Sequence, residues 1–201
     1  MFEMFIERQA QLWSAGEDPP PRADLVAMVA FGATGKRLTR GAQATLEVAV
    51  VLAARYRNVR VASGEFTLSP SPGLEWSLKQ LFFKDPIFAG EVISTIEEAE
   101  KIRAVLPPGF VPEDIVVVTD QWHSRSAKRI WEWVWRDVKP NIHIVAVPSS
   151  ATIDAESPMG LGRRHWTWAL INVLRDKFLE CFPERGIPWM KKLRLRQPVA
   201  H

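Results

Sequence analysis

The stretch that decides the fold is Ile115-Val116-Val117-Val118-Thr119-Asp120-Gln121-Trp122-His123-Ser124-Arg125. It begins with four β-branched residues in a row, a pattern typical of a strand that is buried on both faces. An acid, an amide, an imidazole, a hydroxyl and a guanidinium then follow within six residues. Because the pattern predicts a helix over residues 124–138, these polar groups should lie where a strand passes into a helix.

The same alternation continues on both sides of this stretch. Apolar runs predict strands over residues 25–31, 59–62 and 142–147, with a weaker strand over 88–93. Helices are expected over residues 41–56, 74–83, 95–106 and 161–182. Strands that alternate with helices, several of them uninterrupted apolar runs, favour an α/β fold with a mostly parallel sheet of about five strands and helices on both faces.

The length of the chain limits it to one sizeable core. With 201 residues and 47% hydrophobic residues, a second full domain would be cramped. We expect an amphipathic N-terminal helix over residues 1–15 and a stiff connector at Pro19-Pro20-Pro21. The predicted organisation is therefore an N-terminal helix and Pro-rich connector over 1–22, a single α/β domain over 23–183, and a basic C-terminal tail over 184–201.

The positive charge is concentrated at the C-terminus. Five of the 26 basic residues and none of the 23 acidic ones lie between Arg185 and His201, so 21 basic residues face 23 acidic ones in the rest of the chain. This balance argues against a nucleic-acid partner. No run reaches the roughly 18 apolar residues of a spanning helix, and the acidic start is unlike a secretory signal. With Cys181 as the single cysteine, we expect a cytoplasmic protein without a transmembrane segment.

Ligands of parallel α/β sheets bind beyond the carboxyl ends of the strands. Gly32-Ala33-Thr34-Gly35 follows the first strand, and Arg40 lies just beyond it. Glycines let backbone N–H groups approach an anion, so this loop is either an anion site or a flexible turn. Ser63-Gly64-Glu65 follows the second strand, where Glu65 is either a base or ligand-binding acid, or part of an ordinary strand-ending turn.

Two further segments carry polar groups at element ends. Ser94-Thr95-Ile96-Glu97-Glu98 has the capping-box pattern of a helix start, with Ser94 as the N-cap. In the turn after residue 118, His123 is suited to proton transfer and Arg125 to holding an anion. The alternative is that Asp120 or Ser124 caps the helix and His123 packs in the interior. The clustering of these groups at a strand end favours a functional role.

Other residues give weaker signals. His143 lies inside an apolar strand and is expected to be structural, whereas His165 follows a loop that could cover the strand ends. Trp131, Trp133 and Trp135 cannot all face one side of a helix, so at least one should reach another helix or a second subunit. The chain lacks a GxGxxG fingerprint, a GxSxG elbow and an HExxH pattern, which disfavours common dinucleotide-binding, α/β-hydrolase and zinc sites.

The order of these segments resembles the YdcF–ElyC–SanA family, a bacterial domain of unknown function. Members share glycines after the first strand, Ser-Gly-Gly after the second, an Asn-Thr-x-Glu-Asn helix start and a Val-Thr-Ser/Asp-x-x-His stretch followed by arginine. Here Glu65 replaces a glycine, and Ser94 and Glu98 replace the asparagines. The resemblance spans roughly residues 24–150 and implies a Rossmann-like three-layer sandwich whose polar pocket includes Thr95 and Glu97.

From these features we predict an enzyme that acts on a small anionic substrate, such as a nucleotide, a phosphorylated sugar or an amino-acid derivative. Group transfer or hydrolysis is favoured over redox chemistry because no dinucleotide fingerprint is present. His123, Glu65 and Asp120 are the predicted catalytic residues. The predicted substrate-binding residues are Gly32, Thr34, Gly35, Arg40, Ser63, Gly64, Thr95, Glu97, Thr119, Gln121, Trp122 and Arg125.

Two alternatives stay open at this point. The first is a non-catalytic binding or regulatory module that holds a nucleotide-like ligand in the same pocket. The second is an interaction protein that uses its tryptophans and basic tail. A homo-oligomer formed through the tryptophan-rich helices is a further expectation. The sequence specifies no cofactor, and we expect no metal ligands.

Overall fold

The computed structural model describes residues 2–194 and contains the parallel five-stranded sheet that the sequence predicts. The strands lie in the order β5-β4-β1-β6-β7, and each neighbouring pair is parallel. Their bounds are β1 Leu25–Met28, β4 Arg60–Phe66, β5 Ile87–Val92, β6 Asp114–Asp120 and β7 Asn141–Val147. The two central strands, β1 and β6, are buried along their whole length.

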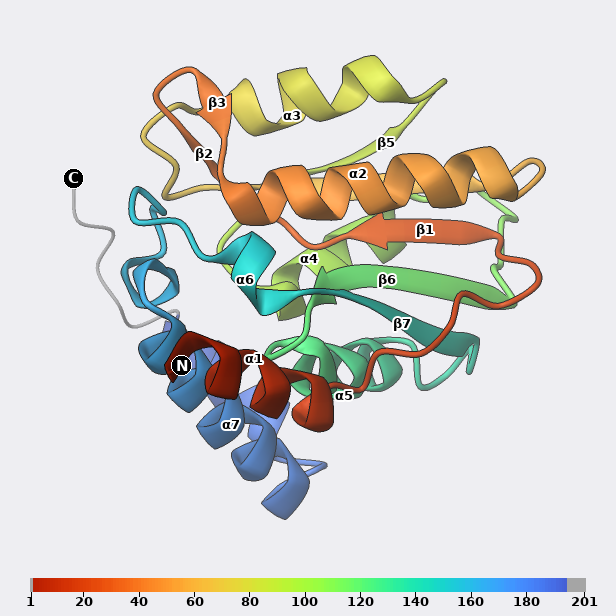
Figure 1. Cartoon of the computed structure of the whole chain (residues 1–201). Helices are drawn as coiled ribbons and strands as arrows, with labels where there is room; N and C mark the ends of the chain where they lie inside the picture. Colours follow the sequence, from red (N-terminus) through yellow and green to blue (C-terminus); the bar gives the residue numbers. More distant parts are fainter. Residues whose placement is uncertain (1, 195–201) are drawn as a thin grey trace.

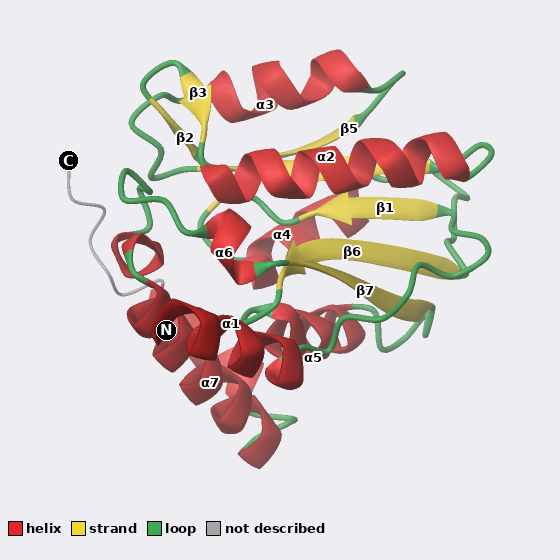
Figure 2. Ribbon diagram, in the orientation of Figure 1, coloured by secondary structure: helices red, strands yellow, loops and turns green. Residues whose placement is uncertain are grey.

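Helices cover both faces of this sheet, as Figures 1 and 2 show. Helices α2 (Arg40–Arg55) and α3 (Leu74–Lys79) make the connections from β1 to β4 and from β4 to β5 on one side. Helices α4 (Thr95–Val105) and α5 (Ser124–Val134) pack on the other side. The fold is therefore the expected α/β, Rossmann-like three-layer sandwich.

This winding creates a switch point between β1 and β6. The chain leaves β1 toward the face that carries α2, and it leaves β6 toward the face that carries α5. The two exits diverge and open a crevice at the carboxyl ends of the central strands. The 120–123 turn lies at this crevice, because β6 ends at Asp120 and α5 begins at Ser124.

Smaller elements surround the sheet. A two-stranded antiparallel hairpin, β2 (Ala33–Thr34) and β3 (Arg37–Leu38), follows β1, and it was not predicted from the sequence. Figure 1 shows this hairpin on the same side of the molecule as the carboxyl ends of the strands. The remaining elements are α1 Phe2–Trp13, η1 Gln80–Phe82, α6 Ser149–Thr152, η2 Gly160–Arg163, α7 His165–Cys181 and α8 Gly186–Arg194.

Two strand boundaries differ from the sequence prediction. The strand expected over 25–31 ends at Met28. The Val29 N–H still donates to the Val118 carbonyl of β6 at 3.0 Å, but the N–H groups of Ala30 and Phe31 donate to side-chain carboxylates and not to a neighbouring strand. Conversely, Ser63-Gly64-Glu65 is not a turn after a strand. It lies inside β4, where the register against β5 shifts between Ser63 and Glu65. The prediction of a strand-ending turn at residues 63–65 was wrong.

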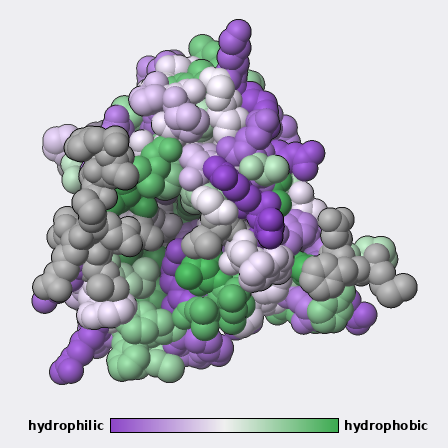
Figure 3. All heavy atoms as spheres, turned by 90° about the vertical axis from the view of Figure 1, so that its left-hand side faces the viewer, coloured by the Kyte–Doolittle hydropathy of each residue, from purple (hydrophilic) through white to green (hydrophobic). Residues whose placement is uncertain are grey.

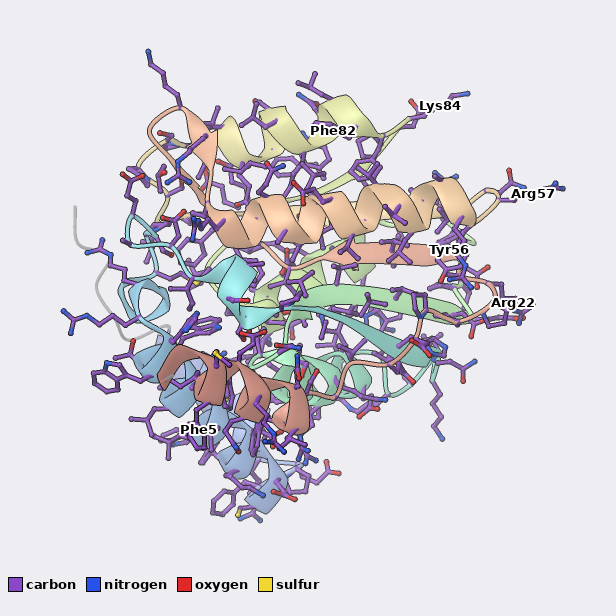
Figure 4. All side chains as sticks on the ribbon, viewed as in Figure 1. Phe5, Arg22, Tyr56, Arg57, Phe82 and Lys84 are labelled. Atoms are coloured by element: carbon purple, nitrogen blue, oxygen red, sulfur yellow. The ribbon has the colours of Figure 1, made fainter. Side chains whose placement is uncertain are left out.

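The amino end of the sheet is held by polar contacts far from the crevice. The Tyr56 hydroxyl donates to the Pro20 carbonyl at 2.9 Å, and Arg22 pairs with Asp114 at 2.9 Å. Figure 4 shows Arg22 and Tyr56 at the end of the sheet opposite the β2–β3 hairpin. The connector over residues 14–24 thus ties α1 to the domain, and Ile6 and Ala10 of α1 are buried in the core.

Part of the C-terminal segment is helical. Helix α8 packs on α7 through the buried Ile187, and Lys191 pairs with Glu100 at 2.7 Å. Residues 195–201 of the predicted basic tail lie outside the described residues. No helix within residues 2–194 combines the length and the apolar character needed to cross a membrane.

Candidate functional site

A small cavity of about 70 Å³ lies at the switch point between β1 and β6. Figure 3 looks onto the side where the strands end, and it shows hydrophobic and hydrophilic residues interspersed there. The cavity wall combines five polar or charged residues with an otherwise apolar lining. The five are Ser94, Thr95, Glu98, His123 and Arg175, and the apolar residues are Val29, Ala30, Phe31, Phe66, Val92, Ile93, Met159 and Trp168.

The imidazole of His123 is held at both of its nitrogens. Nδ1 lies 2.9 Å from Oδ1 of Asn172, and Nε2 lies 2.7 Å from Oγ1 of Thr95. The Asn172 amide nitrogen donates to the Trp168 carbonyl at 2.8 Å, so its oxygen faces the ring. In the tautomer that carries its proton on Nδ1, Nδ1–H donates to that oxygen and Nε2 accepts from the Thr95 hydroxyl.

The Thr95 hydroxyl can reach the ring because another residue caps the helix. Ser94 is the N-cap of α4, and its hydroxyl accepts from the Glu97 N–H at 3.2 Å. The Glu97 carboxylate accepts from the Ile93 N–H at 3.0 Å and pairs with Lys101 at 2.8 Å. The expected capping role of Ser94 is thus confirmed. Thr95, the first residue of α4, is left to contact His123 at the positive end of the helix.

Asp120 supports His123 from inside the fold. Its buried carboxylate accepts from the His123 N–H at 2.8 Å and from the Trp168 indole N–H at 2.9 Å. Its other oxygen accepts from the hydroxyls of Ser149 and Thr152 at 3.1 and 2.8 Å. Burial raises the pKa of Asp120, and these hydrogen bonds oppose the rise. Asp120 is not part of the cavity wall; it fixes the turn that carries His123.

Arg175 brings a positive charge to the same ring. Its Nη1 lies 3.2 Å from Nδ1 of His123 and 3.3 Å from Oδ1 of Asn172. A guanidinium remains charged under all ordinary conditions, so it disfavours a second positive charge on the imidazole.

Glu98 places a buried carboxyl group on the opposite part of the wall. It is 1% exposed, and it accepts from the Ala30 N–H at 3.1 Å and from the Gly64 N–H at 3.0 Å. Burial raises the pKa of Glu98 to about 7, while the charge of Lys79 and the two N–H donors oppose the rise. Near neutral pH this carboxyl can therefore either donate or accept a proton.

The loop after β1, in which an anion site was considered, is filled by side chains of the protein. Glu75 accepts from the N–H groups of Phe31 and Gly32 at 3.1 and 3.0 Å, and it pairs with the fully buried Lys79 at 2.7 Å. The Ser69 hydroxyl oxygen accepts from the Ala33 N–H at 3.3 Å. Backbone donors that could hold a phosphate are thus already bonded to a carboxylate, which repels anions.

The rest of that loop faces away from the cavity. Gly35 lies in the exposed β2–β3 turn with φ of 54°, a conformation that favours glycine. Thr34 contacts Glu156 at 3.4 Å, and the Arg40 N–H donates to Asp154 at 3.0 Å. Arg37 pairs with Asp154 and Glu156 at 3.0 and 2.8 Å. Arg37 of the hairpin therefore pairs with two acids of the loop over residues 153–159.

Two other residues predicted for the site have structural contacts elsewhere. Glu65 accepts from the Gly73 N–H at the start of α3, and burial raises its pKa. The Arg125 Nε donates to the Trp13 carbonyl, and its guanidinium lies 4.6 Å from the centre of the Trp13 ring. Neither residue lines the cavity.

The remaining predicted residues have contacts inside the fold and do not line the cavity. Ser63 donates to the Met28 carbonyl and accepts from Lys79 at 2.8 Å. The Gln121 side chain accepts from the Ser149 N–H at 3.2 Å, and Trp122 packs against Trp13. Thr119 is fully buried in β6. Of the predicted residues, the structure brings Thr95 and His123 together at the cavity.

His143, His165 and the tryptophans at positions 131, 133 and 135 lie away from this site. His143, on β7, is 3.4 Å from Asp114, and His165 begins α7 without lining the cavity. Trp131 and Trp135 are buried and stacked, with 6° between their ring planes. The Arg136 guanidinium lies over the Trp133 ring, 4.1 Å from its centre. Two of the three tryptophans on α5 are thus used inside the fold.

Sequence reasoning missed Asn172, Arg175 and Glu98. Asn172 lies four residues after Trp168 on the buried side of α7, and an amide inside the otherwise apolar run over residues 168–174 was the available signal. Glu98 was treated as a departure from the family pattern, although it lies in the same helix turn as Thr95.

Comparison with models of protein families, with curated proteins and with solved structures finds no match to this chain. Within residues 2–194, no group of three or more His, Cys, Asp or Glu side chains is arranged to hold a metal ion. The fold and the cavity therefore define a Rossmann-like α/β protein with a polar site at its switch point.

Proposed function

We propose that this protein is an enzyme that acts on a small anionic substrate by hydrolysis or group transfer at the switch-point cavity. The observation that carries the proposal is the chain of contacts from Thr95 through His123 to Asn172, with distances of 2.7 and 2.9 Å. A nucleophile, a base and a third group that orients the base recur in this relation in enzymes that use covalent catalysis.

The reaction uses these groups in order. The Thr95 hydroxyl attacks the electrophilic carbon of an acyl group, and its proton passes to Nε2 of His123. That proton then passes to the leaving group as the bond to it breaks, which leaves the acyl group on Thr95 as an ester. Water, or another acceptor, attacks this ester with His123 again taking the proton, and the Thr95 hydroxyl is restored.

The surroundings of the pair support this use. The positive end of α4 lies at Thr95, where it stabilises negative charge that develops on the attacked group. Arg175 lines the same cavity and supplies a cation for the anionic part of the substrate. Membership in the YdcF–ElyC–SanA family stays a prediction, and the proposal does not depend on it.

A reactive β-lactone tests the nucleophile directly. We expect one equivalent of the probe to add to the protein, with peptide mapping placing it on Thr95. Thr95→Val should abolish the adduct, and Thr95→Ser should retain it because the hydroxyl is kept. His123→Ala should slow labelling at least tenfold, whereas the control His143→Ala, on β7, should not.

Equal labelling of Thr95→Val and the unmodified chain would contradict the role given to Thr95. Thermal unfolding of each variant separates the loss of a reactive group from the loss of the fold. Labelling of Thr95 that does not depend on His123 would assign the proton transfer to another group.

A second candidate function is a non-catalytic binding module, and the position of Arg175 favours it. A guanidinium 3.2 Å from Nδ1 works against the proton that His123 must accept during catalysis. Native mass spectrometry of the purified protein distinguishes the two functions. A ligand that stays bound and is unchanged after prolonged incubation favours binding, whereas its conversion to product favours catalysis.

A further inference from the structure

We propose that the outward side of α7, together with the exposed side of α1, binds to the surface of a membrane that contains anionic lipids. The inference concerns a different surface from the switch-point cavity and does not rest on the proposed function. Its first ground is the distribution of polarity around α7. Trp166, Leu170 and Leu174 recur every four residues on one side of this helix and are 52%, 52% and 56% exposed.

The polar residues of α7 that a surface helix would ordinarily turn to the solvent point inward instead. Asn172 and Asp176 are fully buried and contact His123 and Arg129, each at 2.9 Å. Six of the seven residues over 168–174 are apolar, so apolar side chains lie around most of this part of the helix. A helix that is apolar all round is normally covered on every side, which indicates that a partner covers the outward side of α7.

Helix α1 shows the same feature beside α7. The two helices pack against each other at the lower left of Figure 1. Ile6 and Ala10 of α1 are buried in the core, whereas its exposed side includes large apolar side chains, namely Met4, Phe5 and Leu12. Figure 3 shows hydrophobic residues gathered in the lower part of the side that it presents, which is the part where α1 and α7 lie. Exposed apolar side chains thus gather on two neighbouring helices, as in an interaction surface.

The charge of the same two segments favours an anionic partner. Residues 1–13 and 160–194 contain nine of the 26 basic residues and five of the 23 acidic ones, a net charge of +4. The rest of the chain has 17 basic and 18 acidic residues, a net charge of −1. The net positive charge of the protein therefore lies in the segments that carry these exposed apolar side chains.

Most of these basic side chains are exposed and can reach a surface. Among the side chains that the structure describes in the two segments, six exposed ones are basic and two, Glu180 and Glu184, are acidic. The six are Arg8, Arg163, Arg164, Lys177, Arg185 and Lys192. Arg8 lies on the exposed side of α1, and Arg163 and Arg164 directly precede α7. Basic residues beside exposed Trp, Phe and Leu are typical of helices that lie in the interface of an anionic membrane.

A groove where α7 meets α8 has the same combination of groups. Phe178, Phe182 and Trp189 line a cavity of about 230 Å³, and Arg185 completes its wall. Tryptophan is enriched at membrane–water interfaces, because its ring is apolar and its N–H can still meet water. The groove therefore offers apolar contacts to a lipid and a guanidinium to its phosphate.

The charge also argues against two other partners. A second copy of the chain on this surface would bring two net charges of +4 together, and like charges repel. A nucleic acid would match the charge, but the leucines of α7 have no counterpart in its phosphate backbone. An anionic bilayer satisfies both features, because apolar side chains enter its interface while basic side chains contact its headgroups.

Co-sedimentation of the full chain with lipid vesicles tests the inference. We expect binding to vesicles of phosphatidylcholine with about 30% phosphatidylglycerol and at least tenfold weaker binding to phosphatidylcholine alone. Binding should also weaken at about 0.5 M NaCl, because salt screens the attraction between the basic side chains and the headgroups. The double substitution Leu170→Glu with Leu174→Glu should reduce binding at least tenfold, because it places two acids on the outward side of α7.

Two phenylalanines provide a matched pair of single variants. Phe5 and Phe82 are 59% and 58% exposed, so Phe5→Glu and Phe82→Glu change charge and exposed apolar surface to the same extent. Figure 4 shows Phe5 on α1 at the lower left and Phe82 near α3 at the top. We expect Phe5→Glu to weaken vesicle binding and Phe82→Glu to leave it unchanged.

Cys181 supplies a reporter that leaves the apolar side chains intact. It is the single cysteine, it is exposed, and it lies two helical turns after Leu174 on the same side of α7. The emission of a polarity-sensitive fluorophore on Cys181 should shift to shorter wavelength when anionic vesicles are added. The same fluorophore in the variant Cys181→Ser with Arg57→Cys should not shift, because Figure 4 shows Arg57 at the far end of the sheet.

Absence of binding to the anionic vesicles would overturn the inference. So would equal binding of the unmodified chain and the double variant of α7. A dimer in sedimentation equilibrium that dissociates in this double variant, without any binding to vesicles, would assign the surface to a second copy of the chain. Thermal unfolding confirms that each variant is folded, and the exposure of both leucines favours this result.

Discussion

The segments that leave β1 and β6 start from the same edge of the sheet but have opposite uses. After β1, the N–H groups of Ala30, Phe31 and Gly32 are bonded to Glu98 and Glu75. After β6, the turn carries His123 to the cavity and fixes it through Asp120. At the end of β1 the backbone donors are bonded to the protein's own acids, whereas the turn after β6 places a side chain in the cavity wall. Backbone N–H donors thus converge at the strand ends of this fold, and side chains from other segments determine whether those donors are available to a ligand.

The largest expected effect concerns the loop after β1, whose N–H groups are bonded to Glu75, and the substitution that tests it is Lys79→Met. Lys79 and Glu75 are both fully buried and 2.7 Å apart, and the substitution leaves Glu75 without its cation. We expect the free energy of unfolding to fall by about 3–5 kcal/mol, as measured by urea denaturation. Lys177→Met removes a lysine from an exposed pair with Glu180 and should cost at most about 0.5 kcal/mol.

A double substitution, Glu75→Gln with Lys79→Met, checks the reason for that loss. If the cost comes from an uncompensated buried charge, the double variant should be more stable than Lys79→Met alone. A double variant that is less stable would show that the hydrogen bonds of Glu75 to the β1 loop outweigh its charge.

The second prediction concerns pH and Glu98, which accepts from the Ala30 N–H after β1 and lines the same cavity as His123. The pKa of Glu98 is raised to about 7, so the native state holds this proton more tightly than the unfolded chain does. The free energy of unfolding should therefore fall as pH rises from about 4.5 to about 7, by about 3 kcal/mol from this group. Asp120, whose pKa is also raised by burial, acts in the same direction.

Glu98→Gln isolates the contribution of Glu98, because it cannot ionise. The difference in free energy of unfolding between this variant and the unmodified chain should change across pH 4.5–7 and stay constant above about pH 8. Glu91→Gln, at an exposed position, should show no such change. A difference that is independent of pH would mean that Glu98 has an ordinary pKa.

The fold could be predicted from the sequence because strands that are buried in a parallel sheet are continuous runs of apolar, often β-branched residues. The run Ile115-Val116-Val117-Val118 is completely buried in β6, as its β-branched composition indicates. Strand ends were predicted less well. The apolar run predicts a strand that continues through Phe31. In the structure, however, the N–H groups of Ala30 and Phe31 donate to the carboxylates of Glu98 and Glu75. Those partners are more than 40 residues away, so no local pattern reveals them.

The residues of the candidate site that the sequence pointed to are those that lie beside a local signal. His123 stands out because it follows a strand within a polar turn, and Thr95 because it begins a helix. Arg125 was predicted to bind an anion because the family motif has an arginine shortly after its histidine, yet the arginine that lines the cavity is Arg175, which is 52 residues from His123. The orientation of α7 over the crevice depends on tertiary packing against α5, and sequence periodicity does not specify it.

The smallest expected effect tests whether the hairpin after β1 takes part in binding. Arg37 is half-exposed and pairs with Asp154 and Glu156, and exposed pairs contribute about 0–1 kcal/mol. Arg37→Ala should therefore lower the free energy of unfolding by no more than about 1 kcal/mol. Inorganic phosphate, compared with chloride at the same ionic strength, should raise the thermal midpoint of the variant and of the unmodified chain equally. A phosphate-specific rise that disappears in Arg37→Ala would show that the hairpin binds an anion, and the two strand ends would then have the same use.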